Sequence, residues 1–499
     1  MNMSSFIHFK IKWLLLLFVL LSSGYSGAQN TNLLKFQQGK PFKIVQFTDV
    51  HWDNNHSNCK ETASVMKMVL SAEKPDLIVL TGDIVTYSPA AAGWNSISAI
   101  MSESGIPWVV TLGNHDDEAE LSRSQIFDLL ETKKGFIGRK GPKEISGTGN
   151  YILEIQASDS DKTAALLYCL DSHGYPADKK LGSYDWVKFD QIRWFRDQSQ
   201  KFTRSNGGIP LPALAYFHIP TPEYKEVYGS QSSLGEKNEE VASPLINSGL
   251  IASMIEMGDV MGTFTGHDHE NNYIALYHNL ALAYGQVTGV NAYGKFERGA
   301  RVVEINEGAY SFNTWIRTKS GVSHPYNYPF GGTYDETAYE FLKAKQLTSM
   351  KPGITFSYYE GKFKSTDEFA GAVPVKTGII QEISLEPRQA EDHFAFEFSA
   401  WIEIPEKGLY RFYTFSDDGS KLFIGGKLVV DNDGSHSARR KDGSIALEKG
   451  FHQFRLLYFD DYMGETLEVG ISGLTFREKP VSGNMLFIPE NKNKATPGK

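Results

Sequence analysis

The first half of the chain is organised around Trp108-Val109-Val110-Thr111-Leu112, followed directly by Gly113-Asn114-His115-Asp116. A short apolar run that stops at a glycine predicts a buried strand ending in a tight loop. This loop carries an amide, an imidazole and a carboxylate on consecutive residues. Asn, His and Asp are also ordinary turn residues, so the tetrapeptide gains weight only if other strands end in the same way.

Four other apolar runs do end in polar residues of these kinds. Together with the first, they occupy residues 42–47, 76–80, 108–112, 214–217 and 260–264. The polar residues that follow them are Asp49, His51, Asp83, Asn114, His115, His218, His267 and His269. Helix-like segments separate several runs, which predicts an α/β domain with a partly parallel sheet. Ligands of such sheets collect beyond the carboxyl ends of the strands, where these side chains lie.

The chemistry of these side chains favours metal binding. Carboxylates, imidazoles and an amide oxygen form a mixed nitrogen and oxygen donor set that suits Fe, Mn or Zn. If His115 is set aside, seven candidate ligands remain, whereas one zinc site normally takes four. A dinuclear site with one bridging carboxylate accounts for the surplus.

The motifs, taken in order, resemble the calcineurin-like metallophosphoesterase superfamily. They are Asp49-Val50-His51, Gly82-Asp83, Gly113-Asn114-His115-Asp116, His218 and Gly266-His267-Asp268-His269. Finer features resemble its secreted, purple-acid-phosphatase-like branch: Phe217-His218-Ile219-Pro220, Leu170-Asp171-Ser172-His173-Gly174-Tyr175 and Tyr184-Asp185-Trp186. The resemblance implies a four-layer α/β/β/α sandwich over residues 40–318. It also implies hydrolysis of phosphate mono- or diesters by a metal-bound hydroxide at a dinuclear site.

The resemblance also implies a role for each site residue. One metal would be bound by Asp49, His51 and His269, the other by Asn114, His218 and His267, with Asp83 bridging the two. His115 would face the substrate and assist the leaving oxygen. Asp116 would orient His115 through a hydrogen bond. Both are therefore predicted catalytic residues.

The chain departs from the purple acid phosphatases at one position. Those enzymes carry a metal-bound tyrosine three residues after the bridging aspartate, where this chain has Thr86, followed by Tyr87. We therefore expect no tyrosinate-iron chemistry and no purple chromophore. A further set of side chains has two readings, as lining of a substrate pocket or as ordinary packing: His173, Tyr175, Tyr184 and Trp186.

The last third of the chain alternates in the strand period and predicts an all-β sandwich or barrel over residues 353–475. The run Ser416-Asp417-Asp418-Gly419-Ser420 resembles the PA14 family, in which some lectins hold calcium through an aspartate pair. Asp417 and Asp418 are thus candidate calcium ligands, and glycans are candidate partners. Gly425-Gly426 and Asp417-Asp418-Gly419 both predict hairpin turns. We expect a linker at residues 319–352 and a tail at 476–499.

The ends and the composition set the remaining expectations. Residues 1–28 read as a secretory signal peptide cleaved after Ala28, so we expect a secreted or periplasmic protein without a transmembrane segment. A net charge of −9 in 499 residues gives no sign of a nucleic-acid groove. Whether Cys59 and Cys169 pair stays open. The alternative function is that of a carbohydrate-binding protein whose metal domain is vestigial or structural.

Overall fold

The structure is a computed structural model that describes residues 34–490 except 231, 335, 370–371 and 474–475. The predicted signal peptide and the extreme C-terminus lie outside the described residues. Within them, no helix is both long and apolar enough to cross a membrane.

Two β-sheets form the centre of the first domain. The larger sheet runs in the order β1 (Leu34–Lys35), β5 (Tyr151–Gln156), β6 (Thr163–Cys169), β7 (Ala213–Tyr216), β8 (Val260–Thr265), β10 (Leu280–Tyr284) and β9 (Ile274–Tyr277). The smaller sheet runs in the order β13 (Gly321–Tyr328), β12 (Phe312–Thr318), β11 (Gly299–Ile305), β2 (Phe42–Phe47), β3 (Leu77–Thr81) and β4 (Trp108–Thr111). Strands β2, β3 and β4 are parallel, as are β6, β7 and β8, so each sheet gathers several carboxyl ends at one edge.

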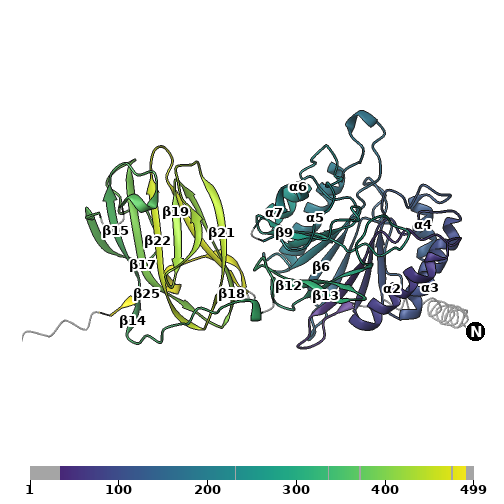
Figure 1. Ribbon diagram of the computed structural model, residues 1–499, viewed down its shortest axis with the longest axis horizontal. Coiled ribbons are helices and arrows are strands. Elements are labelled where there is room, and N and C mark those ends of the chain that lie inside the picture. The colour runs from purple at the N-terminus through teal and green to yellow at the C-terminus, as the bar shows by residue number, and fades with distance from the viewer. Residues whose placement is uncertain (1–33, 231, 335, 370–371, 474–475, 491–499) are drawn as a thin grey trace, which may run out of the picture. The chain divides into compact units, whose positions relative to one another are not determined.

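Helices cover the two sheets on opposite sides, as Figure 1 shows. One layer contains α2 (Asn58–Glu73), α3 (Ala90–Ser104) and α4 (Arg123–Leu130), and the other contains α5 (Phe189–Ser205), α6 (Tyr224–Val227) and α7 (Leu250–Met257). Met66 and Val69 of α2 enter the core that includes the smaller sheet, and Ile192 and Phe195 of α5 pack in the core against the larger one. The predicted four-layer α/β/β/α sandwich is confirmed.

The smaller sheet continues past the predicted end of the domain at residue 318. Strand β13 (Gly321–Tyr328) pairs with β12 inside the segment that we expected to be a linker. Pro325 lies within this strand, and proline is tolerated there because β13 is at the edge of the sheet. The buried side chains of Tyr326 and Tyr328 anchor the strand.

The second domain is a sandwich of two antiparallel sheets. The larger sheet runs in the order β14 (Met350–Pro352), β25 (Leu486–Pro489), β17 (Phe394–Ile404), β22 (Gly450–Asp460), β19 (Ser420–Ile424) and β20 (Lys427–Asn432), with β15 (Ile354–Glu360) on β17 and β16 (Lys376–Ile380) on β15. The smaller sheet runs in the order β21 (Arg439–Leu447), β18 (Gly408–Asp417), β23 (Thr466–Gly473) and β24 (Phe476–Pro480). Alternate residues of β17, among them Phe396, Phe398 and Ile402, are buried in the core between the sheets.

Two expectations for this domain differ from the structure. Strands β24 and β25 lie within the predicted tail, because their apolar residues Phe476, Leu486 and Ile488 pack on the sandwich. Asp417-Asp418-Gly419 is not a hairpin turn, since β18 belongs to the smaller sheet and β19 to the larger one. This connection crosses from one sheet to the other. Gly425-Gly426 does join the antiparallel hairpin of β19 and β20.

Short 3₁₀ turns complete the connections. They are η1 (Lys179–Leu181), η2 (Glu336–Ala338), η3 (Thr366–Phe369) and η4 (Gly483–Met485).

Candidate metal centre

The predicted ligands all lie just after strand ends, and both sheets contribute. Asp49 and His51 follow β2, Asp83 follows β3 and Asn114 follows β4, all in the smaller sheet. His218 follows β7, and His267 with His269 follow β8, in the larger sheet. The geometry sorts six of the seven into two groups that could each hold a metal ion. The seventh, Asn114, lies between Gly113 and His115, whose backbones both approach the Asp83 carboxylate.

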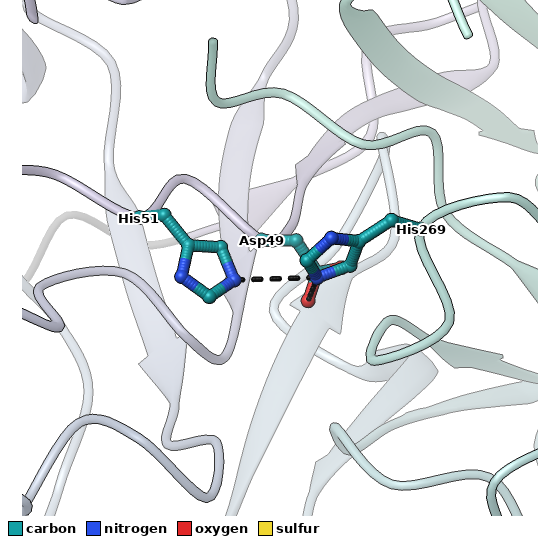
Figure 2. A group of neighbouring side chains, drawn as sticks. All are labelled: Asp49, His51 and His269. Atoms are coloured by element: carbon teal, nitrogen blue, oxygen red, sulfur yellow. Dashed lines mark hydrogen bonds and ion pairs between the residues drawn. The ribbon is translucent and has the colours of Figure 1, made fainter. Parts of the chain in front are cut away.

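The first group contains Asp49 and His51 from the loop after β2 and His269 from the loop after β8, and Figure 2 shows these side chains close together. The Nε2 atoms of His51 and His269 are 3.2 Å apart, and Nε2 of His269 lies 3.3 Å from Oδ1 of Asp49. On its other side, Nδ1 of His51 is 3.3 Å from the hydroxyl of Thr86. Thr86, which occupies the position of the metal-bound tyrosine of purple acid phosphatases, therefore contacts the ring of His51, while Tyr87 is 48% exposed.

The second group contains Asp83, His218 and His267. Oδ2 of Asp83 lies 3.2 Å from Nε2 of His218 and 3.9 Å from Nε2 of His51. Asp83 of the second group therefore also lies near a histidine of the first group. Nδ1 of His218 contacts the carbonyl of Thr81 at 2.8 Å, which turns Nε2 of that ring toward Asp83.

Several buried polar atoms of the centre fit a cation. Among the described residues, Oδ1 of Asn114 and Nε2 of His267 are buried without a hydrogen-bond partner, and Nε2 of His218 has only its ion-pair contact with Asp83. Leaving such an atom unpaired costs about 1–3 kcal/mol. The amide of Asn114 donates to the hydroxyl of Tyr175 at 3.1 Å, so its oxygen is the end directed elsewhere. As potential metal ligands, these atoms are an amide oxygen and imidazole nitrogens, a set that suits Fe, Mn or Zn.

Backbone geometry at the strand ends is costly. Asp49, His51, Asp83 and His267 have φ values of 52°, 43°, 51° and 79°. Residues other than glycine rarely adopt this left-handed region; each costs about 1–3 kcal/mol and persists only where the surroundings enforce it. Four such residues in one centre indicate that the fold holds these side chains in place at the expense of stability.

Two glycines let the loops approach one another closely. A Cβ atom at Gly113 would lie 2.2 Å from Oδ1 of Asp83, and one at Gly82 would lie 2.4 Å from Nδ1 of His218. Either contact is shorter than real Cβ atoms show. Glycine is therefore required at both positions for the ligand of the neighbouring loop to reach the centre.

The ligands divide by charge in the metal-free centre. Burial lowers the pKa of His267 to about 3 and that of His51 to about 4. Burial also acts to lower the pKa of His218, but the adjacent Asp83 outweighs it and raises the pKa to about 9. For Asp83, burial acts upward, yet His218 and His51 hold the pKa well below its usual range. At neutral pH the His218 imidazolium thus lies beside the Asp83 carboxylate, and a cation bound there would replace that proton.

His115 and Asp116 do not make the contact that we expected. Both carboxylate oxygens of Asp116 accept backbone N–H groups, from Asp83, Ile84, Val85 and Gly113, at 2.7–3.0 Å. Asp116 therefore fastens the loop after β3 to the end of β4. The structure instead places Glu118 beside His115, with Oε2 of Glu118 at 2.6 Å from Nδ1 of the imidazole.

The four candidate pocket residues separate into two pairs. The Tyr175 hydroxyl contacts Asn114, and the edge of Tyr184 packs on His267 with ring centroids 4.4 Å apart. His173, by contrast, contacts Gln191 at 2.8 Å, and Trp186 packs under the ammonium of Lys188.

Sequence reasoning missed two neighbours of the centre. Glu118 sits in an acidic run, Asp116-Asp117-Glu118, in which nothing but its i+3 spacing from His115 singles it out. Tyr293 stacks on His269 with ring centroids 4.0 Å apart, and its hydroxyl donates to Glu239 at 2.8 Å. Tyr293 lies in a loop outside the predicted motifs, so no local signal pointed to it.

The predicted calcium ligands of the second domain lie on the connection between its sheets. The Asp418 carboxylate accepts the backbone N–H groups of His436 and Asp461, each at 2.8 Å, and Oδ2 of Asp417 accepts that of Ala438 at 2.9 Å. Nearby, Oδ1 of Asp460 is a buried oxygen with no hydrogen-bond partner among the described residues.

Comparison with known proteins gives matches to both halves of the chain. A profile of the calcineurin-like phosphoesterase family matches residues 42–271, and a profile of the PA14 domain matches residues 350–476. A relative from Arabidopsis thaliana, named probable inactive purple acid phosphatase 29, is 35% identical over 58% of this chain and 82% of its own length. Phosphatase DCR2 of Saccharomyces cerevisiae is 31% identical over 58% of this chain and 56% of its own length.

Among solved structures, a dimetal phosphatase from Danio rerio covers 58% of this chain and 98% of its own, at 10% identity and a TM-score of 0.43.

Proposed function

The chain belongs to the calcineurin-like phosphoesterase family, and on that premise we propose that it hydrolyses phosphate mono- or diesters at a two-metal centre. The observation that supports the proposal most directly is the pair of buried side-chain groups, Asp49, His51 and His269 beside Asp83, His218 and His267. Uncatalysed phosphate-ester hydrolysis is among the slowest reactions known, so a catalyst must stabilise several developing charges at once.

The ligand assignment follows the two groups. Asp49, His51 and His269 would hold one metal, and Asn114, His218 and His267 would hold the other, with Asp83 shared between them. The unpaired Oδ1 of Asn114 supports its inclusion in the second set. When bound, two such cations neutralise charge on the phosphoryl oxygens and lower the pKa of a water molecule, which supplies the nucleophile.

The chain's own residues would do the remaining work. His115 borders the centre: its side chain is 38% exposed, and its backbone N–H donates to Oδ1 of Asp83 at 2.9 Å. The backbone of His115 is thus tied to the Asp83 carboxylate, while its ring remains partly exposed. Such a group can give a proton to the leaving oxygen, a step worth about 10²–10⁴-fold in rate. Asp116 would act by fixing the loop that carries Asp83.

The alternative is a carbohydrate-binding protein whose metal domain is vestigial or structural. The name of the Arabidopsis relative includes the words probable inactive, which describes that protein. In this chain the arrangement of His115 favours the enzyme, because a structural metal site needs no partly exposed imidazole on a residue whose backbone is tied to its shared carboxylate. Thr86, in place of the expected tyrosine, supports a centre without a purple chromophore.

The test compares p-nitrophenyl phosphate with its bis ester, using purified full-length chain supplied with Mn²⁺ or Zn²⁺. We expect hydrolysis of at least one ester and close to two metal ions per chain by elemental analysis. Asp83→Ala should lose both metal and activity, whereas Asp161→Ala, at a side chain 92% exposed, should keep both. Less than one metal ion per chain, or full activity in Asp83→Ala, would contradict the proposal.

For the PA14 domain, we propose a glycan-binding role that uses calcium held by Asp417 and Asp418. The unpaired buried oxygen of Asp460 nearby supports a cation at this end of the sandwich, and oxygen-rich loops suit calcium. Calorimetric titration of wild type and Asp417→Asn with Ca²⁺, followed by glycan-array binding, tests the role. Glycan binding without any activity on phosphate esters would favour the alternative function. Secretion through residues 1–28 is likewise a proposal, tested by sequencing the N-terminus of the exported protein.

A further inference from the structure

His115 and Glu118 are brought together by a turn at the end of β4. The backbone N–H of Glu118 donates to the carbonyl of His115 at 3.3 Å, and this turn places Oε2 of the carboxylate 2.6 Å from Nδ1 of the imidazole. The contact occupies Nδ1 and leaves Nε2 as the ring nitrogen available to a ligand. The ring itself lies near the first metal group, with its centroid 5.9 Å from that of His51.

The second oxygen of Glu118 is also held. The hydroxyl of Tyr175 donates to Oε1 of Glu118 at 2.9 Å and accepts the side-chain N–H of Asn114 at 3.1 Å. The direction of this chain of bonds is fixed at its start, because the Asn114 amide nitrogen can only donate and the tyrosine hydroxyl has one proton to pass on. Glu118 is therefore the acceptor from Tyr175, and it accepts from Nδ1–H of His115 at its other oxygen.

We propose that Glu118 is a positioning residue that keeps the His115 imidazole protonated at Nδ1 and directs Nε2 toward the phosphate ester. This inference rests on the proposed function of the centre. In the neutral ring the Nδ1–H tautomer leaves a lone pair on Nε2, and in the charged ring Nε2 carries the proton that passes to the leaving oxygen. Glu118 thus orients His115 through a hydrogen bond, the role that we expected for Asp116.

The anchoring of Glu118 distinguishes it from an ordinary surface charge. The side chains of His115 and Glu118 are 38% and 46% exposed, and an exposed ion pair alone contributes little to stability. Here, however, the carboxylate is fixed at both oxygens: Asn114 donates to Tyr175, Tyr175 donates to Glu118, and His115 donates to the other oxygen of Glu118. The proposed metal ligand Asn114 and the proposed proton donor His115 are therefore connected through Tyr175 and Glu118.

The first test needs neither metal nor turnover. Nitrogen-15 spectra of the histidine rings are recorded on the metal-free, full-length chain at alkaline pH, where the imidazole is neutral, and His115→Ala assigns the signal. We expect the Nδ1–H tautomer to predominate in wild type and the Nε2–H tautomer to predominate in Glu118→Ala. In Tyr175→Phe the fraction of the Nδ1–H tautomer should decrease. Glu131→Gln, at an exposed glutamate that ends α4, should match wild type.

The second test uses the metal-loaded enzyme and two leaving groups. Phenolate leaves poorly without a proton, whereas p-nitrophenolate leaves readily, so loss of positioning should affect phenyl phosphate more. We expect Glu118→Ala to lose about 10–100-fold more kcat on phenyl phosphate than on p-nitrophenyl phosphate, within the range of general acid catalysis.

An Nε2–H tautomer in wild type, or a tautomer unchanged in Glu118→Ala, would overturn the inference. Equal losses on the two esters would do the same. If wild type hydrolyses no ester at all, the proposed function fails, while the ring spectra still decide the role of Glu118.

Discussion

Metal binding should become about tenfold tighter with each unit of pH between 6.5 and 8.5, because a proton must leave His218 before its imidazole can bind a cation. Burial acts to lower the pKa of His218, but the Asp83 carboxylate, 3.2 Å from Nε2, more than compensates and raises it to about 9 in the metal-free centre. Below that pH, proton and metal compete for the same nitrogen.

The size of the effect follows from the pKa values. Across two pH units below about 9 the apparent association constant should rise about 100-fold, equivalent to about 3 kcal/mol. His51 and His267 add nothing in this range, since burial lowers their pKa values to about 4 and 3. In Asp83→Asn the largest raising charge is absent and only Asp49 and the Thr81 carbonyl still act upward, so the pKa of His218 should fall and the steep region should move to lower pH.

The assay titrates chelator-stripped, full-length chain with Zn²⁺ against a chromophoric chelator at pH 6.5, 7.5 and 8.5. Calorimetry at pH 7.5 in two buffers of different ionisation enthalpy should show release of about one proton from His218 as the metal binds. Association constants that agree within about threefold across the range, after correction for zinc hydrolysis, would refute this reasoning, and so would an absence of proton release.

The same linkage has a consequence for the metal-free protein. A histidine whose folded pKa is raised stabilises the fold fully below its unfolded pKa of about 6.5, and this contribution is lost as pH rises through about 9. The thermal midpoint of the metal-free protein, measured by circular dichroism, should therefore decrease as the pH rises from 6.5 to 9. A midpoint that rises over this window would contradict the charge assigned to His218.

Three further outcomes follow from the contacts of the centre. His115→Ala should keep its metal by elemental analysis and lose about 10²–10⁴-fold in kcat, whereas Asn114→Ala should weaken one of two metal-binding steps; metal loss in His115→Ala would reverse these roles. Gly113→Ala should lose metal because its Cβ would meet a ligand oxygen at 2.2 Å, while Gly408→Ala, with its nearest neighbour at 3.6 Å, serves as the control. Iron-loaded protein should lack a visible tyrosinate band, since Thr86 occupies the expected tyrosine position, and a purple solution would show that another tyrosine binds the metal.

The part of the structure that could be predicted is the set of strands that each end in a polar candidate ligand. Each strand end carries its own ligand, as Asp83 and His218 do, and parallel strands align their carboxyl ends whatever the details of packing. The positions of these residues could therefore be inferred without knowing any contact between them. Hydrophobic periodicity does not encode the order of strands in a sheet. The two-sheet arrangement was therefore predicted only through the resemblance of the ordered motifs to a family.

What escaped prediction depends on side-chain direction and on pairing across long distances. Asp116 and Glu118 are both acidic and near His115, and only the path of the backbone decides which one meets the ring. The stretch 324–334 is rich in Pro, Tyr and Gly, a composition typical of a linker, yet Pro325 is acceptable at the sheet edge where β13 pairs. Asp417-Asp418-Gly419 has the composition of a hairpin turn, and local sequence does not report that its flanking strands enter different sheets.

The separation of the ligands along the chain constrains when the centre can form. His51 and His269, whose nitrogens are 3.2 Å apart, are 218 positions apart in sequence and follow strands of different sheets. Contacts of such high sequence separation form late in folding, because the intervening chain must close first. A partly synthesised chain that still lacks His269 thus has no complete first group. Under the proposed function, both metals can bind only after the strands of the two sheets have come together, so the ions available where folding is completed would decide which metals fill the centre.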